Sequence, residues 1–359
     1  MDHEELHVHR GERSGLQIAV AVHSTRLGPA LGGARLWRYT APGDAVADVL
    51  RLSEAMTYKA AAAGLDLGGG KSVICAQDEL DSATRRDAML DLGDVVDSLG
   101  GRYVVAEDVG TGTADMTVVA ERTPHVVGLP PEMGGTGDPS PVTARGVESA
   151  IRAACERALG TSRLDGVRVC VVGLGHVGAA LAERLSRAGA RVLAADIDPA
   201  KREVAAGIGA GWVEPDRAIA AECDVLAPCA LGGAVDQGVV AALRCAVLCG
   251  SANNVLADDS LAADLAARGI LYVPDFIANA GGLINVYAEL RELPGERVSD
   301  LVDGIGAAAG DILDEAERSA VTPLAAAHEL ARRRLAGPAE GRLRAASARN
   351  GNSPARLTA

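Results

Sequence analysis

Residues 167–198 constrain the fold more than any other segment of this chain. They give an apolar strand, then Gly173-x-Gly175-x-x-Gly178, then an amphipathic helix, and then a second strand that ends at Asp196. In this setting the glycines allow a tight turn and the close approach of a pyrophosphate to a helix N-terminus. The segment therefore predicts a βαβ unit of the dinucleotide-binding, doubly wound type.

The same unit predicts the cofactor. We expect the loop residues Gly173, Leu174, Gly175, His176, Val177 and Gly178 to hold the pyrophosphate. Asp196 would accept hydrogen bonds from the adenosine ribose and would repel a 2′-phosphate, which favours NAD over NADP. The alternative, a fold that has lost its nucleotide, stays open.

The remaining pattern predicts an α/β protein of two domains, because 359 residues can form two cores. Residues 1–135 form the first domain, a glycine- and proline-rich hinge follows, and residues 140–290 form the Rossmann domain. Cys229, Ala230, Asn253 and Asn279 follow predicted strands of the second domain, where such sheets bind their ligands. Helices at about 283–292 and 297–332 would return to the first domain and complete it over about 297–335, and residues 337–359 would be disordered.

A second segment, residues 53–74, places two lysines on either side of a glycine run. Lys59 would lie on the last turns of a helix, and Lys71 would open a strand after a tight turn at residues 68–70. Two cations around one small space indicate an anionic substrate. An apolar setting would lower a lysine pKa and make it an acid/base group. The alternative is that both lysines are solvated surface residues.

Two further positions allow a structural and a functional interpretation. Gly32 and Gly33 are either an ordinary turn or a pair whose backbone N–H groups face a carboxylate. Asp108, at a predicted strand end, is either a turn residue or the partner of Lys71.

Composition excludes several classes of function. A net charge of −13 and only eight aromatic residues argue against a nucleic-acid surface. No apolar run has membrane-spanning length, and the N-terminal sequence lacks the apolar core of a signal peptide, so we expect a cytoplasmic protein. Seven cysteines without metal-ligand spacing give no reason to expect a metal site.

Eight motifs carry a family resemblance: LGPALGGARLW, AMTYKAAAAGLDLGGGKSVI, AEDVGT, GDPSPVTARGV, VVGLGHVG, LAPCALGG, GSANNVL and PDFIANAGGLINV. From about residue 17 to residue 330 the chain resembles the glutamate/leucine/phenylalanine/valine dehydrogenases, in the branched-chain and phenylalanine arm. The resemblance implies reversible, NAD-dependent oxidative deamination of an L-amino acid to a 2-oxo acid and ammonia. It also implies an active site in the cleft between the domains and a homo-oligomer, for which an edge strand at residues 16–23 would offer a pairing surface.

The resemblance further implies roles for single residues. Lys59 would hold the substrate carboxylate with the backbone of Gly32 and Gly33, Lys71 would be the acid/base, and Asp108 would orient the amine and pass protons. Asn279 would help to hold substrate and nicotinamide, and Thr143 would bind the carboxamide. The side-chain pocket would consist of Leu31, Ala106, Leu283 and Val286, whose apolar character favours valine, leucine or isoleucine over phenylalanine and rejects glutamate.

Two positions depart from the family pattern. Many relatives carry threonine at the position of Ala34 and asparagine at that of Ala60, and both changes remove a hydrogen-bonding group that we expect near the site. They leave room for an enzyme of a specialised pathway that acts on an unusual amino acid or couples a 2-oxo acid. A silent NAD-binding protein is a third hypothesis, but Lys71 and Asp108 are both present.

Overall fold

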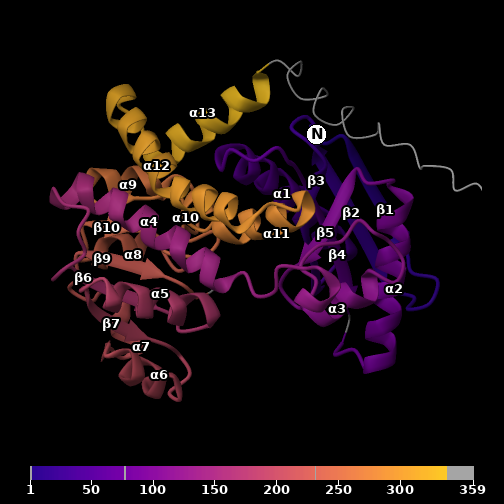
Figure 1. Cartoon of the computed structure of the whole chain (residues 1–359), viewed down its shortest axis with the longest axis horizontal. Coiled ribbons are helices and arrows are strands. Elements are labelled where there is room, and N and C mark those ends of the chain that lie inside the picture. Colours follow the sequence, from indigo (N-terminus) through magenta and orange to yellow (C-terminus); the bar gives the residue numbers. More distant parts are fainter. Residues whose placement is uncertain (1, 77, 231, 338–359) are drawn as a thin grey trace, which may run out of the picture.

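The computed structural model describes residues 2–76, 78–230 and 232–337, which form two α/β halves lying side by side (Figure 1). Each half is built on its own sheet, so the predicted two-domain α/β class is confirmed. A loop with a short 3₁₀ turn, η1 (Pro131–Met133), connects the halves.

The N-terminal sheet has the order β1-β2-β4-β3-β5. Its strands are β1 (Glu5–Arg10), β2 (Gln17–Ser24), β3 (Ala30–Arg38), β4 (Gly68–Ala76) and β5 (Tyr103–Glu107). Strands β4, β3 and β5 run parallel, whereas β1 and β2 are antiparallel to their neighbours. Helix α1 (Pro42–Ala62) packs against one side of this sheet, and α2 (Ser82–Ser98) and α3 (Thr113–Val119) pack against the other.

The two glycine runs of this half lie in strands. The turn predicted at residues 68–70 is therefore wrong, and the turn that was one alternative for Gly32 and Gly33 is not found. Residues 68–70 are the first three residues of β4, and Gly32 and Gly33 lie inside β3. A Cβ on Gly69 would lie 2.1 Å from the backbone nitrogen of Thr57, and a Cβ on Gly70 would lie 2.5 Å from the ring of Tyr103. The glycines are therefore required by close packing of neighbouring elements on the sheet rather than by a bend in the chain.

Strand β2 is an interior strand, so the predicted edge at residues 16–23 is also wrong. Ile18, Val20 and Val22 pack on the α2 side, while Ala19 and Ala21 pack on the α1 side. Strand β1 covers the outer backbone of β2 and is itself the edge. The side-chain pattern of a strand indicates which of its faces are buried and not whether its backbone is paired, so the sequence could not reveal this arrangement.

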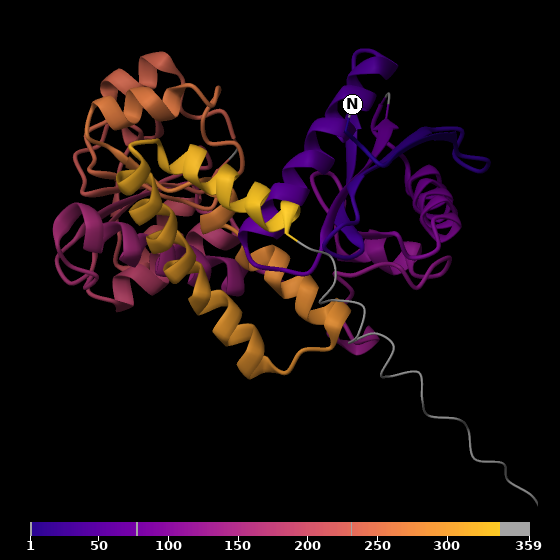
Figure 2. The same ribbon diagram turned by 90° about the horizontal axis from the view of Figure 1, so that it is seen from above.

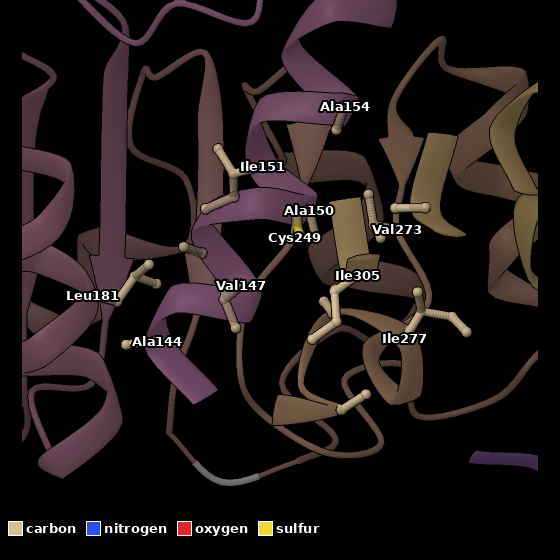
Figure 3. Close-up of a cluster of buried hydrophobic side chains, with 14 of the residues drawn as sticks. Ala144, Val147, Ala150, Ile151, Ala154, Leu181, Cys249, Val273, Ile277 and Ile305 are labelled. Atoms are coloured by element: carbon tan, nitrogen blue, oxygen red, sulfur yellow. The ribbon is translucent and has the colours of Figure 1, made fainter. Parts of the chain in front are cut away.

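The second half contains a fully parallel six-stranded sheet in the order β11-β10-β9-β6-β7-β8. Its strands are β6 (Arg168–Val172), β7 (Arg191–Ala195), β8 (Gly211–Trp212), β9 (Val225–Pro228), β10 (Val247–Leu248) and β11 (Leu271–Tyr272). Its helices are α4 (Ser140–Leu159), α5 (His176–Arg187), α6 (Lys201–Ile208), α7 (Pro215–Ala218), α8 (Gln237–Ala242), α9 (Leu261–Ala267) and α10 (Asp275–Ala278). Val147 and Ile151 of α4 belong to the main core together with Val273 and Ile305 (Figure 3).

The C-terminal residues form α11 (Gly281–Arg291), α12 (Gly295–Ser319) and α13 (Pro323–Ala336). The single helix predicted over about 297–332 is wrong, because α12 ends at Ser319, its C-cap Ala320 has a φ of +53°, and α13 is a separate helix. Thr322 caps α13 through a hydrogen bond from the Ala325 nitrogen, and Pro323 occupies its first position. Helix α12 packs on α4 and α13 packs on α1, so these helices contact both halves (Figure 2). Apart from Gly337, the predicted tail lies outside the described residues.

Candidate active site

A cavity of about 620 Å³ lies between the two halves. Side chains of α1, β3, α11 and α13 contribute to its wall, as do the segments that follow β5 and β10. Twelve residues predicted for the site line it: Leu31, Gly33, Lys59, Lys71, Ala106, Asp108, Thr143, Val177, Asn253, Asn279, Leu283 and Val286. Residues from both sides of the cleft, far apart in sequence, therefore meet at one space.

Lys71 and Asp108 form an ion pair at this cavity. The Lys71 Nζ atom lies 2.8 Å from Oδ2 of Asp108, and the lysine side chain is only 6% exposed. Burial lowers the pKa of Lys71, because water no longer stabilises the ammonium ion, and Arg35 adds to this effect. Burial opposes ionisation of Asp108, yet Lys71 and Arg35 hold its pKa below the usual range. Among the cations near the Lys71 amine, Arg35 lowers its pKa the most.

Lys59 joins the two halves through Asn279. Its Nζ donates to Oδ1 of Asn279 at 2.7 Å, and Nδ2 of Asn279 donates to Oδ1 of Asn253 at 2.9 Å. Burial lowers the pKa of Lys59 to about 8, while the carboxylate of Asp275 acts in the opposite direction. Near neutral pH the amine is therefore mostly a cation at the wall of the cavity.

The apolar part of the cavity comes from both halves of the chain. Leu31 of β3 and Ala106 of β5 are almost completely buried, and they line the cavity together with Leu283 and Val286 of α11. This wall offers no charged group to a ligand side chain. Gly32 does not line the cavity; its carbonyl accepts a hydrogen bond from the Tyr103 hydroxyl at 2.8 Å.

The glycine-rich loop has the form that a pyrophosphate requires. A Cβ on Gly178 would lie 1.9 Å from the Gly173 carbonyl oxygen, and one on Gly173 would approach Ala230 and Cys229 to within 2.9 Å. In contrast, a Cβ on Gly175 would meet no atom of the described residues within 4 Å. Gly175 is the N-cap of α5, and no side chain of the part of the chain that the structure describes caps this helix. Its first N–H groups therefore remain available to an anion.

Asp196 stands at the end of β7 beside this loop. Its Oδ2 accepts a hydrogen bond from the Leu174 nitrogen at 2.6 Å, and its Oδ1 accepts one from the Asp198 nitrogen at 2.9 Å. The next residue, Ile197, is 91% exposed, which is unusual for a large apolar side chain. This corner thus presents a fixed carboxylate and an uncovered apolar surface next to each other.

Comparison with known proteins decides the family. The family model described as Glu/Leu/Phe/Val dehydrogenase, dimerisation domain, matches residues 3–125, and that of glutamate/leucine/phenylalanine/valine dehydrogenase matches residues 201–337. The chain belongs to the Glu/Leu/Phe/Val dehydrogenase family. A model described as the NAD binding domain of D-isomer specific 2-hydroxyacid dehydrogenases matches residues 145–240 of this family member.

The relatives cover nearly the whole chain. Leucine dehydrogenase from Thermoactinomyces intermedius is 41% identical over 93% of this chain and 91% of its own length. Valine dehydrogenase from Streptomyces virginiae is 43% identical over 93% of this chain and 94% of its own. Among solved structures, L-tryptophan dehydrogenase from Nostoc punctiforme has a TM-score of 0.81 at 37% identity and covers 93% of this chain and 96% of its own.

Ala34 and Ala60, the two departures from the family pattern, both lie outside the cavity lining. Ala34 is buried in the core between the N-terminal sheet and α2, and its carbonyl accepts a hydrogen bond from Thr111. Ala60 is buried at the end of α1, where its carbonyl accepts one from Arg334. In this dehydrogenase the two alanines therefore belong to elements that support the site, and neither forms part of its wall.

Charged residues that were not predicted from the sequence lie behind the Lys71–Asp108 pair. Arg35 lines the cavity and donates to Asp108, and Asp48 and Tyr39 lie behind it. The available signal was the position of Arg35, two residues after Gly33, which puts both on the same face of β3. Across residues 2–76, 78–230 and 232–337, no His, Cys, Asp or Glu side chains cluster in a way that could hold a metal ion. Within the same ranges no helix has the length and apolar character needed to span a membrane.

Proposed function

We propose that this chain catalyses the reversible oxidative deamination of an apolar L-amino acid, with valine, leucine or isoleucine preferred. The observation that carries the proposal is the buried Lys71–Asp108 ion pair in a cavity that also holds Lys59 and an apolar wall. Relatives named leucine and valine dehydrogenase, about 41% to 43% identical over 93% of the chain, support the same reaction.

Lys59 binds the substrate carboxylate in this proposal, and Lys71 handles the protons at the amine. A lysine with a lowered pKa takes a proton from the substrate ammonium group, since hydride can leave Cα only when the amine is neutral. NAD, when bound, supplies the hydride acceptor. Water then adds to the former Cα and gives one proton to Asp108, and Lys71 returns its proton to the nitrogen. The C–N bond breaks as the new hydroxyl group passes its proton to the neutral Lys71, so that ammonia departs and the 2-oxo acid is left. Asp108 orients the amine and the attacking water throughout.

The cofactor site in this proposal consists of the residue 173–178 loop, Asp196, Thr143, Cys229, Ala230, Asn253 and Asn279. Open space at Gly175 and the uncapped start of α5 suit a pyrophosphate. The fixed carboxylate of Asp196 suits a ribose with free hydroxyls and opposes a 2′-phosphate, which favours NAD over NADP. Exposed Ile197 would pack against the adenine ring.

The apolar wall selects the substrate side chain. A second carboxylate, such as that of glutamate, would be buried there without a partner, which is costly. An aromatic substrate is the second candidate, because L-tryptophan dehydrogenase from Nostoc punctiforme has a closely similar fold at 37% identity. An unusual amino acid of a specialised pathway would also need an apolar side chain to fit this wall.

We further propose that the enzyme is a homo-oligomer. The match to a family model described as a dimerisation domain supports this, and so does the similarity to a hetero-hexameric glutamate dehydrogenase from Thermus thermophilus at a TM-score of 0.77. The cytoplasmic location stays a prediction from the sequence.

A panel of L-amino acids, assayed for NADH formation in the wild type and in Lys71→Ala, tests the proposed reaction. We expect turnover with branched-chain substrates, and loss of turnover in Lys71→Ala with NADH binding nearly unchanged, because the lysine and the glycine-rich loop belong to different halves. Activity of Lys71→Ala within about tenfold of wild type, which is under about 1.4 kcal/mol of barrier, would remove Lys71 from the acid/base role.

A further inference from the structure

Arg35 contacts the same carboxylate oxygen as Lys71. Its Nε donates to Oδ2 of Asp108 at 3.0 Å, and the Lys71 Nζ lies 2.8 Å from that oxygen. The sheet register explains this meeting. Arg35 pairs with Val73, two residues beyond Lys71, so that both cations project from one face of the sheet. On the other side of β3, Ala34 pairs with the residue before Asp108, which brings Asp108 level with Arg35.

The far end of the Arg35 guanidinium is held as well. Its Nη1 donates to Oδ2 of Asp48 at 3.0 Å, and the same oxygen accepts a hydrogen bond from the Tyr39 hydroxyl at 2.7 Å. Arg51 donates to the other oxygen of Asp48 at 2.7 Å. A planar guanidinium fixed at two edges has little freedom to rotate, and lysine could not replace it in both contacts.

The two cations leave one oxygen of Asp108 available. Both contact Oδ2, and no hydrogen bond to Oδ1 comes from any other described residue. Because Asp108 lines the cavity and its side chain is 22% exposed, Oδ1 can accept from a substrate amine or a water molecule. Without Arg35 the Asp108 carboxylate could rotate about the Cβ–Cγ bond, and either of its oxygens could contact Lys71.

We propose that Arg35 is a positioning residue for the proposed deamination: it fixes the Asp108 carboxylate so that Oδ2 holds Lys71 and Oδ1 receives the substrate amine or water. This inference rests on the proposed function of the Lys71–Asp108 pair. It assigns Arg35 no contact with the reacting atoms.

The charges around Lys71 predict the direction in which its pKa moves when one of them is removed. The charged groups facing the Lys71 amine are Asp108 beyond β5, Arg35 on β3, and Asp48 and Lys59 on α1. Arg35 lowers the Lys71 pKa and Asp48 raises it. Removing the charge of Arg35 therefore moves the Lys71 pKa up, whereas removing that of Asp48 moves it down. Asp48→Asn keeps an oxygen that can accept from Arg35 and Tyr39, so it serves as the matched control.

The test compares Arg35→Met, Arg35→Lys and Asp48→Asn with the wild type in two measurements. The first is the pH profile of kcat/KM for deamination, whose acidic limb reports the base that must be neutral. The second is the pH dependence of amine labelling at Lys71, followed by peptide mass spectrometry, which needs no turnover. Thermal unfolding and NADH binding check that each variant is folded.

We expect Arg35→Met to lower kcat/KM about 10- to 100-fold and to move both the acidic limb and Lys71 labelling to higher pH. Arg35→Lys should return both midpoints toward wild type while kcat stays low, and Asp48→Asn should move them to lower pH. Lowered activity with unmoved midpoints in a folded Arg35→Met would reduce Arg35 to a structural residue and overturn the proposal. If Arg35→Met does not fold, unmoved midpoints in Asp48→Asn together with full kcat in Arg35→Lys overturn it equally. A wild type without turnover on any amino acid would refute the proposed function, while labelling would still decide whether Arg35 controls Lys71.

Discussion

Lys59 and Asn279 are 220 positions apart in the sequence, yet the Lys59 Nζ donates to Oδ1 of Asn279 at 2.7 Å. The bond connects the last turn of α1 in the first half to the residue that caps α10 in the second. Asn279 also donates a hydrogen bond to Asn253, in the segment that follows β10. A change in the separation of the two halves would therefore alter the hydrogen bond of Lys59, the cation that we assign to the substrate carboxylate.

Carboxylate binding should weaken as the pH rises through the pKa of Lys59. Burial lowers that pKa to about 8, so the amine carries its charge below this pH and loses it above. A branched-chain 2-oxo acid is the suitable probe, because it has a carboxylate and no amine to titrate. We expect its Kd for the enzyme–NADH complex to increase between about pH 7 and about pH 10, measured by calorimetry. Lys59→Arg keeps its charge over this range and should bind with little pH dependence. An unchanged Kd in the wild type would contradict the role of Lys59.

Cofactor choice should depend on the charge of Asp196. Asp196→Asn keeps an oxygen for the Leu174 nitrogen and removes only the charge that opposes a 2′-phosphate. We expect the wild type to prefer NAD and the variant to shift the NADP-to-NAD ratio of kcat/KM upward by about tenfold or more. Asp198→Asn is the control, since that carboxylate caps the Ala200 nitrogen two residues further along. Equal kcat/KM for both cofactors in the wild type would show the Asp196 assignment to be wrong.

The methyl group of Ala106 should limit the length of the substrate. It lines the cavity and is almost fully buried, so it takes room that an aromatic ring would need. We expect L-valine, L-leucine or L-isoleucine to exceed L-phenylalanine in kcat/KM, and Ala106→Gly to raise the phenylalanine ratio by a factor equivalent to about 1 to 3 kcal/mol. Ala34→Gly removes the same methyl group from neighbouring strand β3 outside the cavity and should leave the ratio unchanged. A wild type fastest on phenylalanine or tryptophan would mean that Leu283 and the surrounding backbone set the pocket.

The glycine run of β4 should tolerate no side chain. A Cβ at Gly69 would lie 2.1 Å from the Thr57 nitrogen and 2.6 Å from the Ser53 carbonyl oxygen, both backbone atoms of α1. We expect Gly69→Ala to destabilise the protein by about 1 to 3 kcal/mol, measured by denaturant unfolding, and to displace the helix that carries Lys59. Gly207 of α6 has open space around its Cβ position, so Gly207→Ala should instead stabilise by about 0.5 to 1 kcal/mol. A neutral Gly69→Ala would contradict the close-packing explanation of the run.

Local patterns in the sequence determined a large part of this protein. The βαβ unit of residues 167–198 can be predicted from the sequence, with its strand, glycine loop, helix and terminal aspartate. Each part of such a unit has its own periodicity or turn chemistry. Lys59 at a helix end and Asp108 at a strand end were likewise predicted from their immediate neighbours, and both are found there. These features depend on interactions within a few residues of one another.

Tertiary structure alone decided the features that depend on distant neighbours. Glycines at 68–70 suggested a turn because the residues they make room for, Thr57 and Tyr103, are remote in the chain. The strand at residues 16–23 was predicted as an edge because the sequence does not show that β1 pairs with it or that α1 and α2 cover its two faces. Arg35 went unnoticed for the same reason: its meeting with Asp108 follows from the order and register of β4, β3 and β5. Periodicity indicates which side of an element is buried. The element that packs against that side depends on how the whole chain folds.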